Sequence, residues 1–100
     1  MGKYRIGLIK ELAMKLKIED IQAGLHPSEK VAIIETKDGM EAIAIHPRSI
    51  LTGNYLEVGW PVGGENGFYL VELPRQTDTG AYRVWINKEK LEDSDMKVYA

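Results

Sequence analysis

Apolar residues in the first part of the chain recur every three or four positions, which is the spacing of one helix face. In residues 6–18, "IGLIKELAMKLKI", the members of this face are Ile6, Ile9, Leu12, Ala13 and Leu16. The pattern predicts an N-terminal amphipathic helix over about residues 6–18. Residues 14–18 also alternate as a strand would, so the pattern leaves the end of the helix open.

Residues 31–46, "VAIIETKDGMEAIAIH", have the pattern of a β-hairpin. The dipeptide Asp38-Gly39 in the middle favours a two-residue turn, because both central positions of such a turn need positive φ. A turn at these two residues places Ile34 opposite Ile43. Both faces are apolar near the strand ends, so we expect the hairpin to be covered on both sides.

Three later segments alternate with a period of two, namely residues 55–62, 68–73 and 81–87. In the first segment the residues that share the apolar face are Leu56, Val58, Trp60 and Val62. Pro61 cannot donate a ladder hydrogen bond, so this strand is predicted to be an edge or to carry a bulge there. Residues 88–93 suggest a helical turn, and residues 96–100 a last short strand.

The glycine-rich stretch Gly59–Phe68, "GWPVGGENGF", is a candidate phosphate-binding loop. It lacks the Lys and Ser or Thr of a P-loop, and its glycine spacing differs from the dinucleotide-binding fingerprint. Asn66-Gly67 instead favours a two-residue hairpin turn. That turn places Val62 opposite Val71, which brings two apolar faces together. The stretch is therefore predicted to be a turn.

These elements predict a single α+β domain over residues 1–100, with the helix packed on a small antiparallel sheet or barrel of about five strands at residues 31–99. Residues 53–92 resemble the later part of a Src-homology-3-like small barrel, with "EVG" starting a strand, a meander, and "RVWIN" leading into a helical turn. The resemblance implies a fold. It implies no ligand, because the acidic stretch and tryptophan doublet of the peptide-binding members are missing.

Composition narrows the functional classes. The chain has no cysteine, which excludes a disulfide scaffold, a thiolate nucleophile and a cysteine-based metal site. No apolar run approaches the roughly 20 residues that span a bilayer, so we expect a cytoplasmic protein without a membrane span. Residues 1–17 hold five basic residues and one acidic residue, and the rest of the chain is acidic. Because nucleic-acid binders carry a basic face on the main body, this distribution argues against a nucleic-acid partner.

Four side chains form the candidate partner-binding surface. Tyr69 and Val71 are predicted to face the core together with Tyr82, Val84 and Ile86. The residues left on the outer face are Phe68, Leu70, Arg83 and Trp85, next to the polar loop "PRQTDTG" at residues 74–80. Protein interfaces are enriched in these residue types. The alternative is that the helix at residues 6–18 covers this face.

The sequence therefore predicts a small non-enzymatic interaction or regulatory module that binds a protein partner or itself. We expect no cofactor, no metal ligand and no catalytic residue. One alternative is a small-molecule-binding or enzymatic domain that uses His26 or His46, each of which precedes a proline. Another is a small barrel that binds single-stranded nucleic acid on stacked aromatic side chains.

Overall fold

The computed structural model of the chain describes residues 13–93. This part is a β-rich body whose strands are β1 (Ala13–Lys17), β2 (Asp20–Ala23), β3 (Lys30–Thr36), β4 (Gly39–Ile45), β5 (Ile50–Leu51), β6 (Tyr55–Gly59), β7 (Gly63–Glu65), β8 (Phe68–Glu72), β9 (Arg83–Asn87) and β10 (Leu91–Asp93). Two 3₁₀ turns of three residues each, η2 (Pro47–Ser49) and η3 (Lys88–Lys90), precede β5 and β10.

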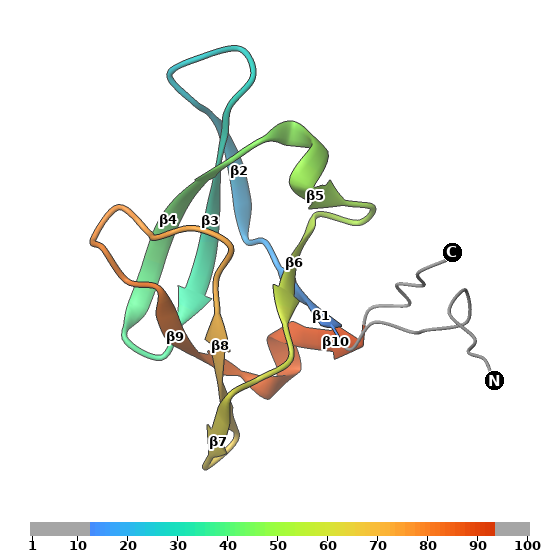
Figure 1. Ribbon diagram of the computed structural model, residues 1–100, viewed down its shortest axis with the longest axis vertical. Helices are drawn as coiled ribbons and strands as arrows, with labels where there is room; N and C mark the ends of the chain where they lie inside the picture. The colour runs from blue at the N-terminus through green and yellow to red at the C-terminus, as the bar shows by residue number, and fades with distance from the viewer. Residues whose placement is uncertain (1–12, 94–100) are drawn as a thin grey trace, which may run out of the picture.

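The strands form three small antiparallel sheets, shown in Figure 1. The first has the order β10-β1-β6-β5, the second β2-β3-β4 and the third β7-β8-β9. Backbone hydrogen bonds also join the second sheet to the third: the Lys37 N–H in the β3–β4 turn donates to the Trp85 carbonyl in β9, and the Asp78 N–H between β8 and β9 donates to the Ala42 carbonyl in β4. The second and third sheets each consist of consecutive strands, whereas the first brings together strands from the beginning, middle and end of the described residues.

The predicted α+β class is wrong, because the segment expected to end the N-terminal helix is a strand. Residues 13–17 form β1, which pairs with β10 on one side and with β6 on the other. The alternation of Met14, Leu16 and Ile18 buries all three side chains, so strand pairing on both sides outweighs the helical spacing. Residues 6–12 of the predicted helix and the predicted last strand at residues 96–100 lie outside the described residues. No helix within residues 13–93 is long and apolar enough to cross a bilayer.

The β3–β4 hairpin is present, but its predicted register is wrong by two residues. Thr36 pairs with Gly39, so Lys37 and Asp38 form the turn, and Ile34 lies opposite Glu41 rather than Ile43. The Thr36 hydroxyl donates to the Gly39 carbonyl at 2.7 Å and so closes the turn one residue earlier. A shift of two keeps every side chain on its predicted face.

The hairpin between β7 and β8 has the predicted turn and register. Asn66 and Gly67 both have positive φ, 50° and 85°, as the favoured two-residue turn requires. The pairing of Gly63 with Leu70 and of Glu65 with Phe68 continues the predicted register. The glycine-rich stretch is therefore a turn between strands, as predicted.

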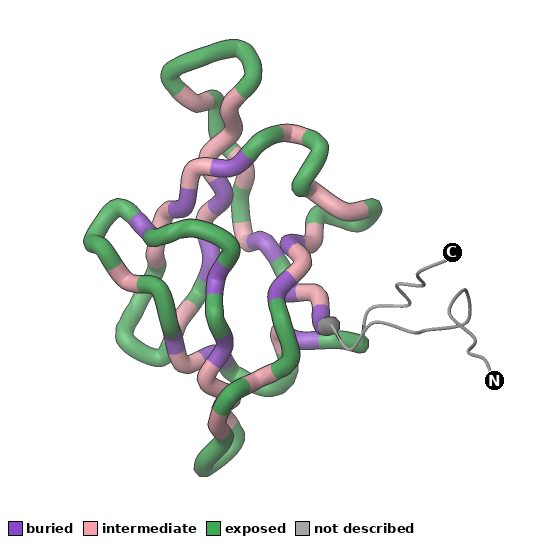
Figure 2. Tube along the Cα trace, viewed as in Figure 1, coloured by how far each residue is buried: buried purple, intermediate pink, exposed green. Residues whose placement is uncertain are grey.

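One hydrophobic core lies between the three sheets, as the purple segments in Figure 2 show. Its most deeply buried large side chains are Leu16, Ile34, Ile43, Ile45, Leu56, Val71 and Ile86. The first sheet supplies Leu16 and Leu56, the β3–β4 hairpin supplies Ile34, Ile43 and Ile45, and β8–β9 supplies Val71 and Ile86. Burying this apolar area is the main term that stabilises the arrangement.

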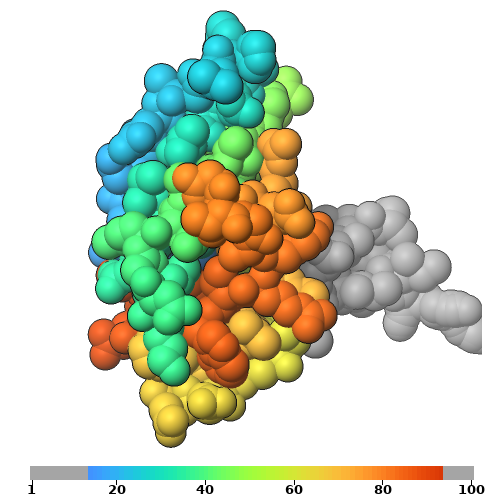
Figure 3. Space-filling model, turned by 90° about the vertical axis from the view of Figure 1, so that its left-hand side faces the viewer, coloured from blue at the N-terminus to red at the C-terminus, as the bar shows by residue number. Residues whose placement is uncertain are grey.

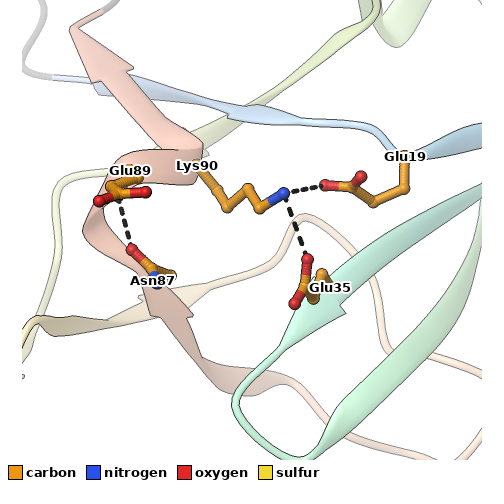
Figure 4. A network of polar contacts seen from close by, with 5 residues as sticks. All are labelled: Glu19, Glu35, Asn87, Glu89 and Lys90. Atoms are coloured by element: carbon orange, nitrogen blue, oxygen red, sulfur yellow. Dashed lines mark hydrogen bonds and ion pairs between the residues drawn. The ribbon is translucent and has the colours of Figure 1, made fainter.

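A polar contact also ties the three sheets together (Figure 4). Lys90 Nζ in η3 lies 3.0 Å from Glu19 Oε2 and 3.2 Å from Glu35 Oε1. Glu19 links β1 to β2 and Glu35 lies in β3, whereas η3 links β9 to β10. The lysine therefore joins all three sheets at one point.

Candidate functional site

The outer face of the β8–β9 hairpin holds the four predicted partner-binding residues. In the observed register Leu70 lies opposite Trp85, and Glu72 lies opposite Arg83, whereas Phe68 pairs with Asn87. Alternation then places Val71 and Val84 in the core and leaves Leu70 and Trp85 on the other face, both half-buried. We call Phe68, Leu70 and Trp85 the outer apolar patch.

Leu70 and Trp85 lie next to Gly63, so the patch borders β7. A Cβ at Gly63 would lie 3.5 Å from Leu70 Cβ and 4.0 Å from the Trp85 ring. At the far end of the patch, Lys37 Nζ lies 5.5 Å from the centre of the Phe68 ring, within cation–π range. The patch therefore has an apolar centre and a polar edge.

Arg83 forms an ion pair with the residue opposite it. Its Nε and one terminal nitrogen lie 2.9 Å and 2.8 Å from the same Glu72 oxygen. Both side chains are half exposed, so the pair is solvated and contributes little to stability. Because its charge is already paired, Arg83 borders the patch as part of a neutral pair rather than as a free cation.

The predicted helix does not cover this patch with the residues that the structure describes. Residues 13–18 turn Met14, Leu16 and Ile18 into the core instead, within a different sheet. The patch is thus an apolar surface on the outside of β8 and β9. Surfaces of this kind commonly mark sites of protein interaction.

The polar loop at residues 74–80 lies against the edge of β4, as Figure 3 shows for the orange and green segments. Asp78 N–H donates to the Ala42 carbonyl, and an Arg75 nitrogen donates to the Ala44 carbonyl. The prediction that Tyr82 faces the core is wrong, because the chain bends at Tyr82 before β9 begins and the side chain is 54% exposed.

A hollow of about 380 Å³ forms a second surface feature, at the open end of the core. Its apolar walls come from Met14, Trp60, Pro61, Val62 and Tyr69. Trp60 and Val62 were predicted to continue the buried face of β6, but they are 53% and 50% exposed. The reason is that β6 ends at Gly59, and the chain then crosses to a different sheet before β7 begins.

One residue of the sequence indicates that β6 ends beside this hollow, although the alternation of apolar residues continues past that point. Pro61 has no N–H to donate, so a continuous ladder through it is not available. The pattern Trp60-Pro61-Val62 therefore marks the end of one strand rather than a bulge within it. Because β6 ends here, the apolar side chains of Trp60 and Val62 lie beside the hollow.

The chain matches no protein-family model, no curated protein and no solved structure.

The two histidines have separate local roles. His46 Nδ1 accepts the Arg48 N–H at 3.0 Å and so caps η2. His26 is exposed in the loop between β2 and β3, and its carbonyl accepts the Glu29 N–H. Within residues 13–93 there is no group of three His, Cys, Asp or Glu residues that could hold a metal ion. The structure therefore does not bring these two histidines into a common site with acidic residues.

A polar cluster lies on the outer face of the first sheet. The Tyr55 hydroxyl donates to Glu92 Oε2 at 2.6 Å, and Lys15 Nζ lies 4.5 Å from the centre of the Tyr55 ring. The hydrogen bond to Glu92 is the largest cause that raises the pKa of Tyr55, followed by partial burial and the negative charge of Glu92. The hydroxyl therefore stays protonated and joins β6 to β10 as a donor.

Proposed function

We propose that this protein is a small non-enzymatic interaction module that binds a protein partner, or a second copy of itself, through the outer apolar patch. The observation that supports this most directly is the position of Leu70 and Trp85, which lie opposite each other on the outside of the β8–β9 hairpin. Tryptophan is enriched among the residues that dominate the binding energy of protein interfaces.

The surroundings of the patch fit the same function. Lys37 lies near Phe68, and the Arg83–Glu72 pair lies at the other end, so charged groups surround an apolar centre. Interfaces commonly have this arrangement of apolar core and polar rim. A groove for single-stranded nucleic acid would instead need several free cations, whereas Arg83 is paired.

The resemblance of residues 53–92 to Src-homology-3-like barrels remains part of this proposal. The meander from β6 to β9 and the 3₁₀ turn before β10 support it. The absence of cysteine supports a reducing, cytoplasmic location.

Replacing Trp85 by alanine tests the proposed surface. We expect Trp85→Ala to lose about 2 kcal/mol of binding free energy, which is about 30-fold in affinity, because the substitution removes the central anchor. Self-association is measured by analytical ultracentrifugation. For other partners, proteins captured by the wild-type protein and by the variant are compared by quantitative mass spectrometry.

Met40→Ala is the matched control, because Met40 is an apolar side chain that is 60% exposed at the tip of a different hairpin. We expect it to leave association and capture unchanged. Equal behaviour of wild type, Trp85→Ala and Met40→Ala would reject the patch as the binding surface. A loss of the far-UV circular dichroism spectrum in Trp85→Ala would instead show that Trp85 acts in folding.

A further inference from the structure

The two strands that carry the outer apolar patch present complementary side chains at the same level. The β8–β9 register places Leu70 beside Trp85, and Glu72 beside Arg83. Residues directly opposite each other on antiparallel strands share one face of the sheet. The outer face of this hairpin therefore holds an aliphatic and an aromatic side chain next to each other at one level, and an acidic and a basic side chain at the next.

Opposite charges also flank the patch at its other end, around Phe68. Glu65 in β7 lies opposite Phe68, so its exposed side chain belongs to the outer face. On the other side, the Lys37 N–H donates to the Trp85 carbonyl, which holds the β3–β4 turn against β9. The Lys37 ammonium lies 5.5 Å from the centre of the Phe68 ring. The acidic residue thus comes from the β7 side of the hairpin and the basic residue from the β9 side.

A two-fold rotation about an axis that runs along the hairpin, between β8 and β9, exchanges these two sides. When two sheets pack face to face about such an axis, β8 of one copy lies over β9 of the other at the same level. Leu70 then contacts Trp85 of the second copy, and Trp85 contacts Leu70 of the second copy. The apolar centre of the patch is therefore complementary to itself.

The same rotation matches the charges. Glu72 of each copy lies over Arg83 of the other, so two ion pairs of single chains become one group of four alternating charges. Glu65 of each copy faces Lys37 of the other, and among the ion pairs of residues 13–93 these two residues do not pair with each other. The face has two acidic and two basic residues, so its net charge is zero and it does not repel a second copy.

We propose that the protein forms a two-fold dimer through this face, with β8 of each copy packed on β9 of the other. The proposal rests on the proposed function, because it takes the outer apolar patch as the binding surface and names a second copy as the partner. Each copy contributes three half-buried apolar side chains. Because such an interface is at the small end of the known range, we expect a dissociation constant of roughly 10–100 µM.

Charge reversal in two separate variants tests the contact between Glu65 and Lys37. Lys37→Glu puts two acidic groups at each of the two symmetric contacts, and Glu65→Lys puts two basic groups there. We expect each variant alone to dimerise at least about tenfold more weakly than the wild type in analytical ultracentrifugation. An equal mixture of both variants restores opposite charges at both contacts. The mixture should therefore regain the wild-type affinity to within about threefold.

Recovery in the mixture excludes a folding defect, because mixing does not refold a misfolded variant. Lys17→Glu is the matched control, since it makes the same change of charge at an exposed residue of the first sheet. We expect it to dimerise as the wild type does. A mixture that associates no better than either variant alone overturns the proposed arrangement, and an equal loss in Lys17→Glu contradicts it too, because net charge would then be the cause.

The wild-type protein separates this dimer from the proposed function. If the wild type stays monomeric up to about 1 mM, a second copy is not the partner and the dimer is rejected. The outer apolar patch would still be the binding surface if Trp85→Ala lost a captured protein. If the wild type and Trp85→Ala dimerise equally well, the contact lies elsewhere on the molecule, and both the dimer and self-association through the patch are rejected.

Discussion

The side chain of Thr77 stabilises the polar loop between β8 and β9 from inside. It is the buried polar residue of this loop, and its hydroxyl accepts the Ala81 N–H at 3.1 Å. The backbone of the same residue also donates to the Ala81 carbonyl at 2.9 Å. The loop therefore closes on itself, and this fixed shape brings Asp78 to the edge of β4.

Thr77→Val keeps the shape of the side chain and removes the hydroxyl. We expect it to lower the free energy of unfolding by about 1–3 kcal/mol, because the Ala81 N–H loses its side-chain acceptor in a buried position. Urea denaturation measures this change. Thr52→Val is the control, since Thr52 is exposed and lies outside this loop. If Thr52→Val costs as much as Thr77→Val, the hydrogen bond of the Thr77 hydroxyl is not the cause.

Among single residues, the sequence predicted the faces of Leu70, Trp85 and Val84 correctly but not that of Tyr82. The first three lie within paired strands, where the period of two is enforced by the ladder. Tyr82 lies one residue before β9, beyond the last residue pair of the regular β8–β9 register. Alternation is thus informative only as far as the pairing extends.

The β7–β8 hairpin is the element whose geometry depends most on its turn residues. Asn66 and Gly67 have positive φ, and the Gly67 carbonyl accepts the Lys88 N–H at 3.0 Å. The turn therefore sets the register of β7 against β8 and also contacts η3.

Gly67→Ala is expected to destabilise the protein by about 1–2 kcal/mol, because a residue with a Cβ is strained at positive φ. The space around position 67 is open, so a steric clash does not contribute. Thermal unfolding followed by circular dichroism measures the loss. Gly59→Ala is the matched control: its surroundings are equally open and its φ is not positive, so we expect no loss there. Equal losses at both positions would contradict the turn argument.

The other elements show that local sequence patterns fail to predict the structure where a segment pairs with strands far along the chain. The β7–β8 register followed from two adjacent residues. In contrast, residues 13–17 satisfy both a helical and an alternating pattern, and their partners β10 and β6 are far along the chain. Local spacing cannot distinguish these cases, because the pairing energy comes from contacts outside the segment. The hollow was missed for the same reason, since its walls come from β1, β8, β10 and the β6–β7 link.

At the scale of the whole molecule, Lys90 holds the three sheets together through its two carboxylate partners. The hydrogen bond to Glu19, and then that to Glu35, raises the pKa of Lys90 above its ordinary value, and partial burial opposes this only in part. A pKa raised by folding gives stability that is complete below the pKa of the unfolded state. That stability is lost as the pH rises through the pKa of the folded state.

We therefore expect Lys90→Gln to melt at a lower temperature than the wild type at neutral pH. The difference should stay constant up to the ordinary lysine pKa of 10.5 and close at higher pH. Melting curves between pH 7 and about pH 12 test this, because this range extends to both sides of that pKa. Tyr55, whose pKa is also raised, titrates in both proteins and cancels in the difference. If the difference in melting temperature persists unchanged at the highest pH, the lower stability of Lys90→Gln comes from lost packing rather than from lost charge. The exposed residue Lys17 provides the control, and Lys17→Gln should show no such gap.

The pairing of the first and last described strands has a practical consequence. Met14 lies directly opposite Asp93, so the body spanning residues 13–93 starts and finishes at neighbouring points, roughly 5 Å apart between Cα atoms. A unit with this geometry can be spliced into a surface loop of a host protein without forcing that loop open. It can also be circularly permuted, with new ends in the exposed loop between β2 and β3, where Leu25 is 93% exposed.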